Sequence, residues 1–94
     1  MDQTPDDQLI EAARAGDPEA RRELVVRHQA AVLALAAQLT PGPADRDDIA
    51  QEVFVRALSR LESFDASRGS FRTWLAAIAL GLLRLGWIVK LSLG

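Results

Sequence analysis

The sequence predicts an all-α protein, a small bundle of about four helices. Apolar residues recur three and four positions apart through most of the chain, as on the buried face of a helix. No alternating apolar and polar run of useful length occurs before residue 86. Signals for helix starts and stops divide the chain into one short and three longer helical segments.

The first helical segment is short and is expected to begin at Thr4-Pro5. Thr4 can cap the helix, Pro5 suits its first position, and the acidic residues that follow favour the positive end of the helix dipole. Leu9 and Ile10 supply a small apolar face, and Gly16 ends the segment.

The second segment is the longest. It begins at Asp17-Pro18-Glu19, which repeats the same start signal, and runs to about Leu39, before a proline- and glycine-rich breaker at residues 40–43. Its broad apolar stripe is expected to be buried and comprises Leu24, Val25, Ala31, Val32, Leu35, Ala36 and Leu39. Its expected outer positions are Arg21, Arg22, Glu23 and Arg27.

The third segment combines a start signal with a clean apolar stripe. Asp45 is expected to cap this helix, with Asp48 three residues on as its capping-box partner. The inward residues repeat at helical spacing: Ile49, Val53, Phe54, Ala57, Leu58 and Leu61. A polar loop is expected from residue 62 to residue 69.

The fourth segment begins at Phe71, with Ser70 as its expected cap. Its core candidates are Trp74, Leu75, Ile78 and Leu82. Phe64, Phe71 and Trp74 offer surfaces on which a nucleic-acid base can stack. At the start of an amphipathic helix, however, we expect these rings to anchor the core.

The C-terminal part is expected to be a core helix followed by a loose apolar tail. Residues 1–80 form the predicted helical domain, and residues 81–94 form a divergent tail. Gly81 and Gly86 interrupt the helical pattern there, at roughly 1 kcal/mol each. A membrane span is the alternative, but a span needs about 20 mostly apolar residues, and Arg84 would lie near its centre.

Length and composition favour a single small binding domain in the cytoplasm. The chain has 94 residues and no cysteine, so a disulfide framework and a thiolate metal site are excluded. Acidic residues follow Met1, the reverse of the basic start of a signal peptide. His28 is the only histidine, and we expect it at a surface or boundary position. Without a phosphate-binding glycine loop or a catalytic triad, we expect no enzyme activity, no cofactor and no small-molecule substrate.

Charge is unevenly divided along the chain. Residues 1–55 carry 5 basic and 11 acidic side chains, whereas residues 56–94 carry 6 basic and 2 acidic ones. The aromatic residues all lie from position 54 onward. An acidic half and a basic, aromatic half suggest two different partners, and chance segregation on a solvated surface is the alternative.

One face of the third segment is suited to docking. Asp48, Gln51, Glu52 and Val55 lie three and four residues apart and therefore share one side of the helix. Favourable placement at the start of a helix explains carboxylates in its first turn. It explains Gln51 and Glu52 poorly, which favours a binding role for this face.

The segment from Asp47 to Ala57 closely resembles the most recognisable stretch of bacterial RNA polymerase sigma factors of the extracytoplasmic-function (ECF) group. The pieces on either side agree in order and spacing: residues 7–17 resemble the entry helices of that family, and residues 64–79 resemble its DNA-melting segment. The resemblance covers about residues 6–79 and corresponds to the domain called region 2, an all-α bundle.

The resemblance implies binding to core RNA polymerase and to promoter DNA. The third helix would dock on the clamp-helix coiled coil of the largest polymerase subunit. The docking residues would be Asp48, Gln51, Glu52 and Val55. The loop that follows would capture an extruded base from the non-template strand of the −10 element. The candidates for DNA contact are Arg56, Arg60, Ser63, Ser67, Arg68, Ser70 and Arg72.

Two features depart from the family pattern. After Ala79 the family continues with an arginine-rich stretch, whereas only Arg84 and Lys90 are basic here. The helix-turn-helix domain that reads the −35 element is not in the sequence. The alternative function is therefore an interaction-only domain that docks on RNA polymerase or an anti-sigma factor without initiating transcription. A membrane-associated helical protein is a third, weaker interpretation.

Overall fold

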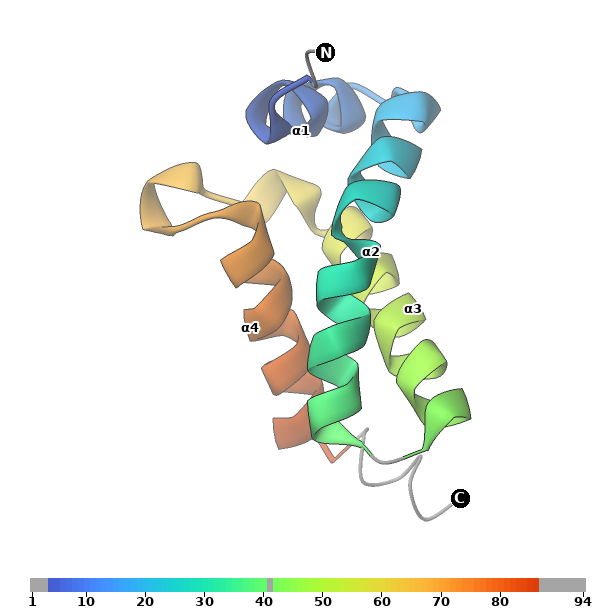
Figure 1. Ribbon diagram of the computed structural model, residues 1–94. Helices are drawn as coiled ribbons and strands as arrows, with labels where there is room; N and C mark the ends of the chain where they lie inside the picture. Colours follow the sequence, from blue (N-terminus) through green and yellow to red (C-terminus); the bar gives the residue numbers. More distant parts are fainter. Residues whose placement is uncertain (1–3, 41, 87–94) are drawn as a thin grey trace.

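The computed structural model describes residues 4–40 and 42–86, which form four α-helices and two short 3₁₀ turns (Figure 1). In chain order the elements are α1 (Asp6–Arg14), α2 (Pro18–Leu39), α3 (Pro43–Ser59), η1 (Leu61–Ser63), η2 (Ala66–Arg68) and α4 (Phe71–Arg84). The described residues contain no strand, and the predicted all-α class is confirmed. Helices α2, α3 and α4 pack against one another, α1 lies across one end of them, and the loop from α3 to α4 projects beside α1 (Figure 1).

Two of the expected helix caps are confirmed. The Asp17 carboxylate accepts a hydrogen bond from the backbone N–H of Glu19 at 3.0 Å. The Ser70 hydroxyl oxygen accepts one from the backbone N–H of Thr73 at 3.1 Å. Each cap satisfies an N–H that the first helical turn leaves without a partner, which is worth about 1 kcal/mol.

The other two helix starts differ from the expected ones. Helix α1 begins one residue later than predicted, with Pro5 in the N-cap position, and Thr4 does not cap it. Helix α3 begins at Pro43, so Asp45 lies within its first turn and the expected capping box of Asp45 and Asp48 is wrong. Proline accounts for the earlier start, because its fixed φ suits the first helical position and it has no N–H to satisfy there.

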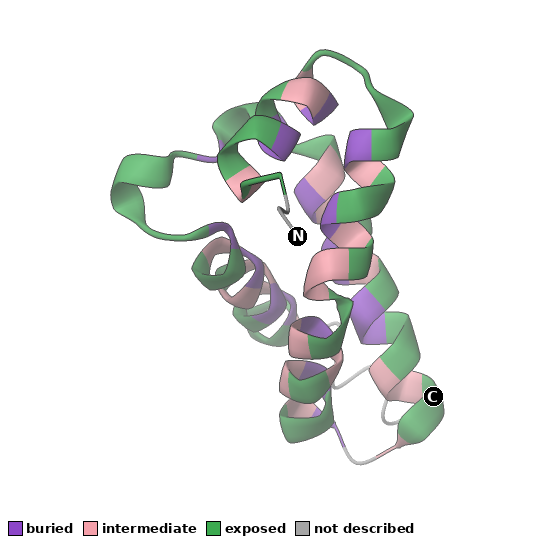
Figure 2. Ribbon diagram, turned by 45° about the horizontal axis from the view of Figure 1, so that its top comes forward, coloured by how far each residue is buried: buried purple, intermediate pink, exposed green. Residues whose placement is uncertain are grey.

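The core lies between α2, α3 and α4 and is closed at one end by α1, with the buried residues turned inward (Figure 2). Its most deeply buried large side chains come from α2, α3, η1 and α4: Leu24, Ile49, Val53, Leu61, Leu75 and Leu82. Burying such a side chain stabilises the fold by roughly 1.5–3 kcal/mol. Four further residues of the predicted stripes are also buried: Val32, Ala36, Phe54 and Ala57. Others are half-buried at the edges of the core, including Trp74 and Ile78, which were predicted as core: Val25, Ala31, Leu35, Leu39, Leu58, Trp74 and Ile78.

Phe64, Phe71 and Trp74 pack together where the loop meets α4. The rings of Phe64 and Phe71 meet edge to face, with centroids 5.4 Å apart, and both residues are buried. Trp74 lies 5.3 Å from Phe64, and His28 of α2 lies 5.3 Å from Phe71. Edge-to-face pairs of this kind add about 0.5–1.5 kcal/mol beyond the area they bury.

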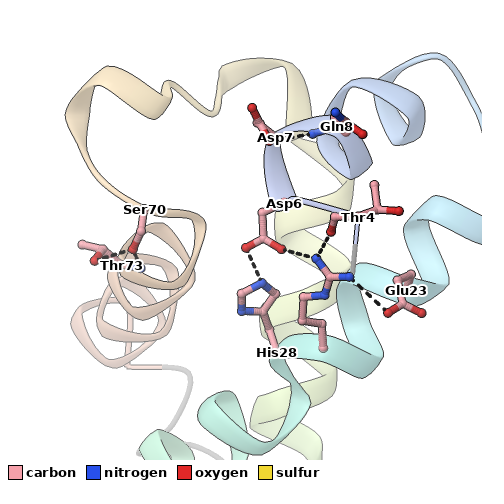
Figure 3. Close-up of polar contacts among 9 residues, drawn as sticks. Thr4, Asp6, Asp7, Gln8, Glu23, His28, Ser70 and Thr73 are labelled. Atoms are coloured by element: carbon pink, nitrogen blue, oxygen red, sulfur yellow. Dashed lines mark hydrogen bonds and ion pairs between the residues drawn. The ribbon is translucent and has the colours of Figure 1, made fainter. Parts of the chain in front are cut away.

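Helix α1 is fastened to α2 by one carboxylate (Figure 3). Asp6 Oδ1 accepts a hydrogen bond from Arg27 Nη1 at 3.1 Å, and Asp6 Oδ2 lies 2.8 Å from His28 Nε2. Arg27 also donates to the backbone carbonyl of Thr4 and pairs with Glu23. The expected outer position of Arg27 is therefore wrong, since its side chain is only 16% exposed. His28 is a boundary residue as predicted, and the described residues hold no cluster of three metal-binding side chains.

The last helix continues beyond the predicted domain boundary at residue 80. Helix α4 passes through Gly81 and ends at Arg84, and Leu82 is 1% exposed. None of the described helices is long and apolar enough to cross a membrane. The division at residue 80 stays a prediction, and most of the predicted tail, residues 87–94, lies outside the described residues.

Candidate docking face and nucleic-acid interface

The four predicted docking residues lie on the side of α3 that faces away from the core. Asp48, Gln51 and Val55 are exposed, and Glu52 is half-buried. The apolar residues between them point into the core, because the helical repeat places the two sets on opposite sides of α3. Val55 is 55% exposed, so this face of α3 presents an apolar side chain beside the acidic ones.

A groove of about 500 Å³ runs between α2 and α3 beside this face. Among the predicted docking residues, only Gln51 and Val55 line it. The other wall comes from α2 and was not predicted: Val25, Gln29 and Leu33. These three residues are four positions apart, and that spacing is a signal in the sequence that they share one helical face. The groove therefore joins the predicted docking face of α3 to a face of α2.

Glu52 and Arg56 bind each other, although the sequence assigned them to different partners. Arg56 Nε donates a hydrogen bond to Glu52 Oε2 at 2.9 Å, one helical turn apart. The two side chains are 28% and 26% exposed. Their charges offset one another at the edge of the predicted docking face, and the pair restricts the rotamers of Glu52. The four-residue spacing, with the acid first, is the sequence signal for such a pair.

The predicted DNA-binding residues do not form one patch. Arg56 and Arg60 line a cavity of about 250 Å³ beside the C-terminal half of α4. Arg72 lines a different cavity, also about 250 Å³, between α4 and α2. The remaining candidates lie on or next to the exposed loop from α3 to α4: Ser63, Ser67, Arg68 and Ser70.

The hydroxyl groups of the loop serines are already engaged as donors. Ser63 Oγ donates to the carbonyl of Arg60 at 2.7 Å, and Ser67 Oγ donates to the Asp65 carboxylate at 2.7 Å. Ser70 Oγ donates to Thr73 Oγ1 at 3.0 Å while it also accepts from the Thr73 N–H. Towards a bound base, these side chains therefore present acceptor lone pairs.

Asp65 shapes the turn at the tip of the loop. Hydrogen bonds from the Ser67 hydroxyl and from the Ser67 backbone N–H lower the pKa of the Asp65 carboxyl group. Because the folded pKa is the lower one, the stabilising effect is complete above the unfolded value of about 4 and is lost as the pH falls below it. At neutral pH the turn is therefore fixed by an ionised carboxylate.

Arg14 holds the base of the loop against α1. Its Nε donates to the carbonyl of Leu61 at 3.1 Å, and its Nη2 donates to the carbonyl of Phe64 at 2.5 Å. Its Nη1 pairs with Glu11 at 2.7 Å on the same helix. The sequence suggested no such role, because Arg14 resembles any basic residue in the last turn of a helix.

We expect Arg14→Ala to lower the free energy of unfolding by about 1.5–3 kcal/mol, because two carbonyl groups lose a charged donor. Urea unfolding followed by circular dichroism measures the change. Arg22→Ala is the matched control, since Arg22 also pairs with a glutamate three residues earlier but is 71% exposed. An equal loss in the two variants would show that the contacts with the loop contribute nothing.

A further cavity of about 280 Å³ lies between α1 and the loop. The loop and the start of α4 form one side of it, and the first turns of α1 form the other, including Asp6, Asp7 and Ile10. Sequence reasoning missed the contribution of α1 to this site. Residues 6–10 and 64–71 lie far apart in the chain and meet only through the packing of α1 across the bundle.

Comparison with known proteins finds similar sequences for most of this chain. The family model described as sigma-70 region 2 matches residues 24–84. The chain is 38% identical over 79 residues to the ECF RNA polymerase sigma-E factor of Escherichia coli K12, a match that covers 84% of this chain and 40% of that protein. It is 34% identical over 80 residues to the RNA polymerase sigma-H factor of Pseudomonas aeruginosa, a match that covers 85% of this chain and 41% of that protein. The chain thus spans about two fifths of the length of these relatives.

A solved structure has the same fold. An NMR structure of an engineered region 2 of sigmaE in complex with GTAAAA aligns with a TM-score of 0.82 and 36% sequence identity. The alignment covers 96% of this chain and 93% of that one.

Proposed function

The chain belongs to the sigma-70 region 2 family, and on that premise we propose that it docks on core RNA polymerase and binds one strand of opened promoter DNA. This family is not an enzyme family, and the proposed role is binding, with no chemical step. The observation that carries the proposal is the exposed acidic face of α3, which lies beside an apolar groove and away from the projecting loop. Two separate surfaces suit two partners.

For the polymerase, we propose the clamp helices of the largest subunit as the binding partner. Asp48 and Glu52 supply carboxylates that pair well with arginine side chains, and Gln51 can fix the register by hydrogen bonding. Val55, together with the groove between α2 and α3, supplies apolar surface for the centre of the interface. The acidic face also suits an anti-sigma factor that competes with polymerase.

For the DNA, we propose the loop from α3 to α4 as the surface that binds the non-template strand of the −10 element. Arg68 and Arg72 are exposed and can contact phosphates, which position a strand without reading its sequence. The similarity to a region 2 that binds GTAAAA supports this assignment. The proposal does not rest on Arg56, which pairs with Glu52.

Binding of the purified chain to a clamp-helix fragment tests the docking role. Tight, saturable binding by a folded monomer supports it, and no binding contradicts it. Transcription by core polymerase on a template with a −10 element then separates initiation from the interaction-only alternative. Binding to polymerase without any transcript would favour that alternative.

We expect Arg68→Ala and Arg72→Ala each to weaken binding to single-stranded DNA about equally for all sequences. Each variant should also reduce the slope of log affinity against log salt concentration by about 0.7, because one phosphate contact is lost. Fluorescence anisotropy at several salt concentrations measures both effects. Arg84→Ala is the control, since Arg84 is exposed at the far end of α4. An equal change of slope in the control would show that only net charge matters.

A further inference from the structure

The cavity between the end of α3 and the C-terminal half of α4, about 250 Å³ in volume, has one basic wall and one apolar wall. Arg56 and Arg60 form the basic wall. The apolar wall consists of residues that share one side of α4: Ala77, Ile78, Gly81, Leu82 and Leu85. Among the described residues, no carboxylate lines this cavity.

Only one of the two arginine charges is offset within the described chain. Arg56 Nε donates to Glu52 Oε2 at 2.9 Å. Arg60 is exposed, and no carboxylate of the described residues pairs with it. The cavity therefore combines apolar surface with a cation that a carboxylate from another molecule can bind.

Gly81 leaves open space on the apolar wall. It lies inside α4, where glycine weakens a helix relative to alanine. A Cβ atom added to Gly81 would meet no atom of the described chain within 4 Å, so the packing of α4 does not require a glycine here. The missing side chain instead lets another molecule approach the backbone of α4 closely.

Apolar surface continues along the same turns of α4. Leu80, Leu83 and Leu85 are 46%, 39% and 73% exposed. Exposed leucines contribute little to DNA binding, which depends on contacts of lysine and arginine with phosphates. A membrane surface takes up a protruding apolar helix face, whereas this apolar wall lines a cavity. The combination therefore favours a protein partner.

We propose that this cavity binds an acidic amphipathic helix of another protein, with an aliphatic side chain in the cavity and a carboxylate on Arg60. A helix that lays its apolar face into a groove is a recurrent mode of recognition. Gly81 allows its close approach, and Arg60 fixes its orientation by a charge-assisted hydrogen bond. The site shares no residue with the proposed docking face of α3 or with Arg68 and Arg72, so the inference does not rest on the proposed function.

Selection of helical peptides displayed on phage against the full chain tests this inference. Peptides that also bind the Gly81→Leu variant are removed by counter-selection, because a leucine at this position fills the cavity. We expect the remaining peptides to carry Asp or Glu together with Leu or Ile at helical spacing. One of them, synthesised with a fluorescent label, is the probe for anisotropy titrations. Circular dichroism verifies that Gly81→Leu is folded, which we expect because leucine favours a helix more than glycine does.

The Arg60→Ala variant should bind this peptide at least about tenfold more weakly, the effect of one charged hydrogen bond. Arg84→Ala removes the same charge from an exposed position of α4 outside the cavity and should keep the wild-type affinity. Replacing the acidic residues of the peptide by their amides should weaken binding to the wild type about equally. Combined with Arg60→Ala, that replacement should add little, because both changes remove the same contact.

Each other outcome overturns the inference. No peptide may survive counter-selection, the survivors may lack acidic residues, or Arg60→Ala may bind the probe as tightly as the wild type does. If Gly81→Leu and Arg60→Ala instead weaken binding to a DNA duplex or to anionic lipid vesicles, the cavity serves that ligand. If sedimentation shows a wild-type dimer and a monomeric Gly81→Leu variant, a second copy of this chain occupies the cavity.

Discussion

A Glu52→Arg variant is expected to bind the clamp-helix fragment at least about 30-fold more weakly than the wild type. Removing one member of a hydrogen-bonded charge pair within an interface costs about 2–5 kcal/mol, and 2 kcal/mol corresponds to about 30-fold in affinity. Here the loss is increased, because the new cation would face the basic side chains of the proposed partner. Titration of the labelled fragment at fixed salt concentration measures the affinity.

The chain offers a closely matched control for this variant. Glu19 of α2 also pairs with an arginine on the next helical turn, Arg22, with a distance of 2.6 Å. Glu19→Arg therefore breaks an equivalent pair and makes the same change of net charge, but away from α3. Equal losses in the two variants would indicate a general charge effect, and an unchanged affinity in Glu52→Arg would exclude Glu52 from the interface.

The fold itself should tolerate the change at Glu52. Helical ion pairs of this spacing contribute only about 0.2–0.5 kcal/mol to stability, and the Glu52–Arg56 pair is partly exposed. A thermal unfolding curve for Glu52→Arg should therefore lie close to that of the wild type. A loss of binding in a folded variant then reports on the interface.

A Leu61→Ala variant is expected to lose about 2–5 kcal/mol of stability. The Leu61 side chain is 0% exposed, at the point where α3 gives way to the loop, and its truncation leaves a cavity in the core. Small domains are stable by only about 5–15 kcal/mol, so this is a large fraction of the total. Urea unfolding followed by circular dichroism should show a much lower midpoint.

Leu80→Ala is the control for this second variant. Leu80 lies on α4 and is 46% exposed, so the same chemical change removes little buried surface. We expect its stability to stay within about 0.5 kcal/mol of the wild type. If both variants lose the same stability, Leu61 is not part of a tightly packed core. Because Leu61 begins the loop, the destabilised variant should also bind single-stranded DNA more weakly.

The helix boundaries show how well local signals in the sequence predict where a helix begins. Asp17 and Ser70 were correctly predicted as caps, because a cap depends on the side chain and on the next three backbone groups. At the start of α3 two local signals compete, and Pro43 begins the helix before Asp45 can cap it. The sequence alone does not rank two signals of similar strength that lie two residues apart.

The sequence by itself determined the four helices, the apolar stripe of each, and the side of α3, facing away from the core, on which Asp48, Gln51, Glu52 and Val55 lie. All of these follow from the helical repeat, which relates residues three and four positions apart. Their binding role, and that of the loop residues, stays a prediction that the experiments above address.

Only the tertiary structure decided how α1 completes the molecule. The bonds from Arg14 to the carbonyls of Leu61 and Phe64 join residues 47 and 50 positions apart, and the contacts of Asp6 with Arg27 and His28 join residues 21 and 22 positions apart. The cavity between α1 and the loop is likewise formed by residues that lie far apart in the sequence. Such contacts depend on how the helices cross, and crossing is fixed by the packing of the whole core, which no local pattern of residues encodes.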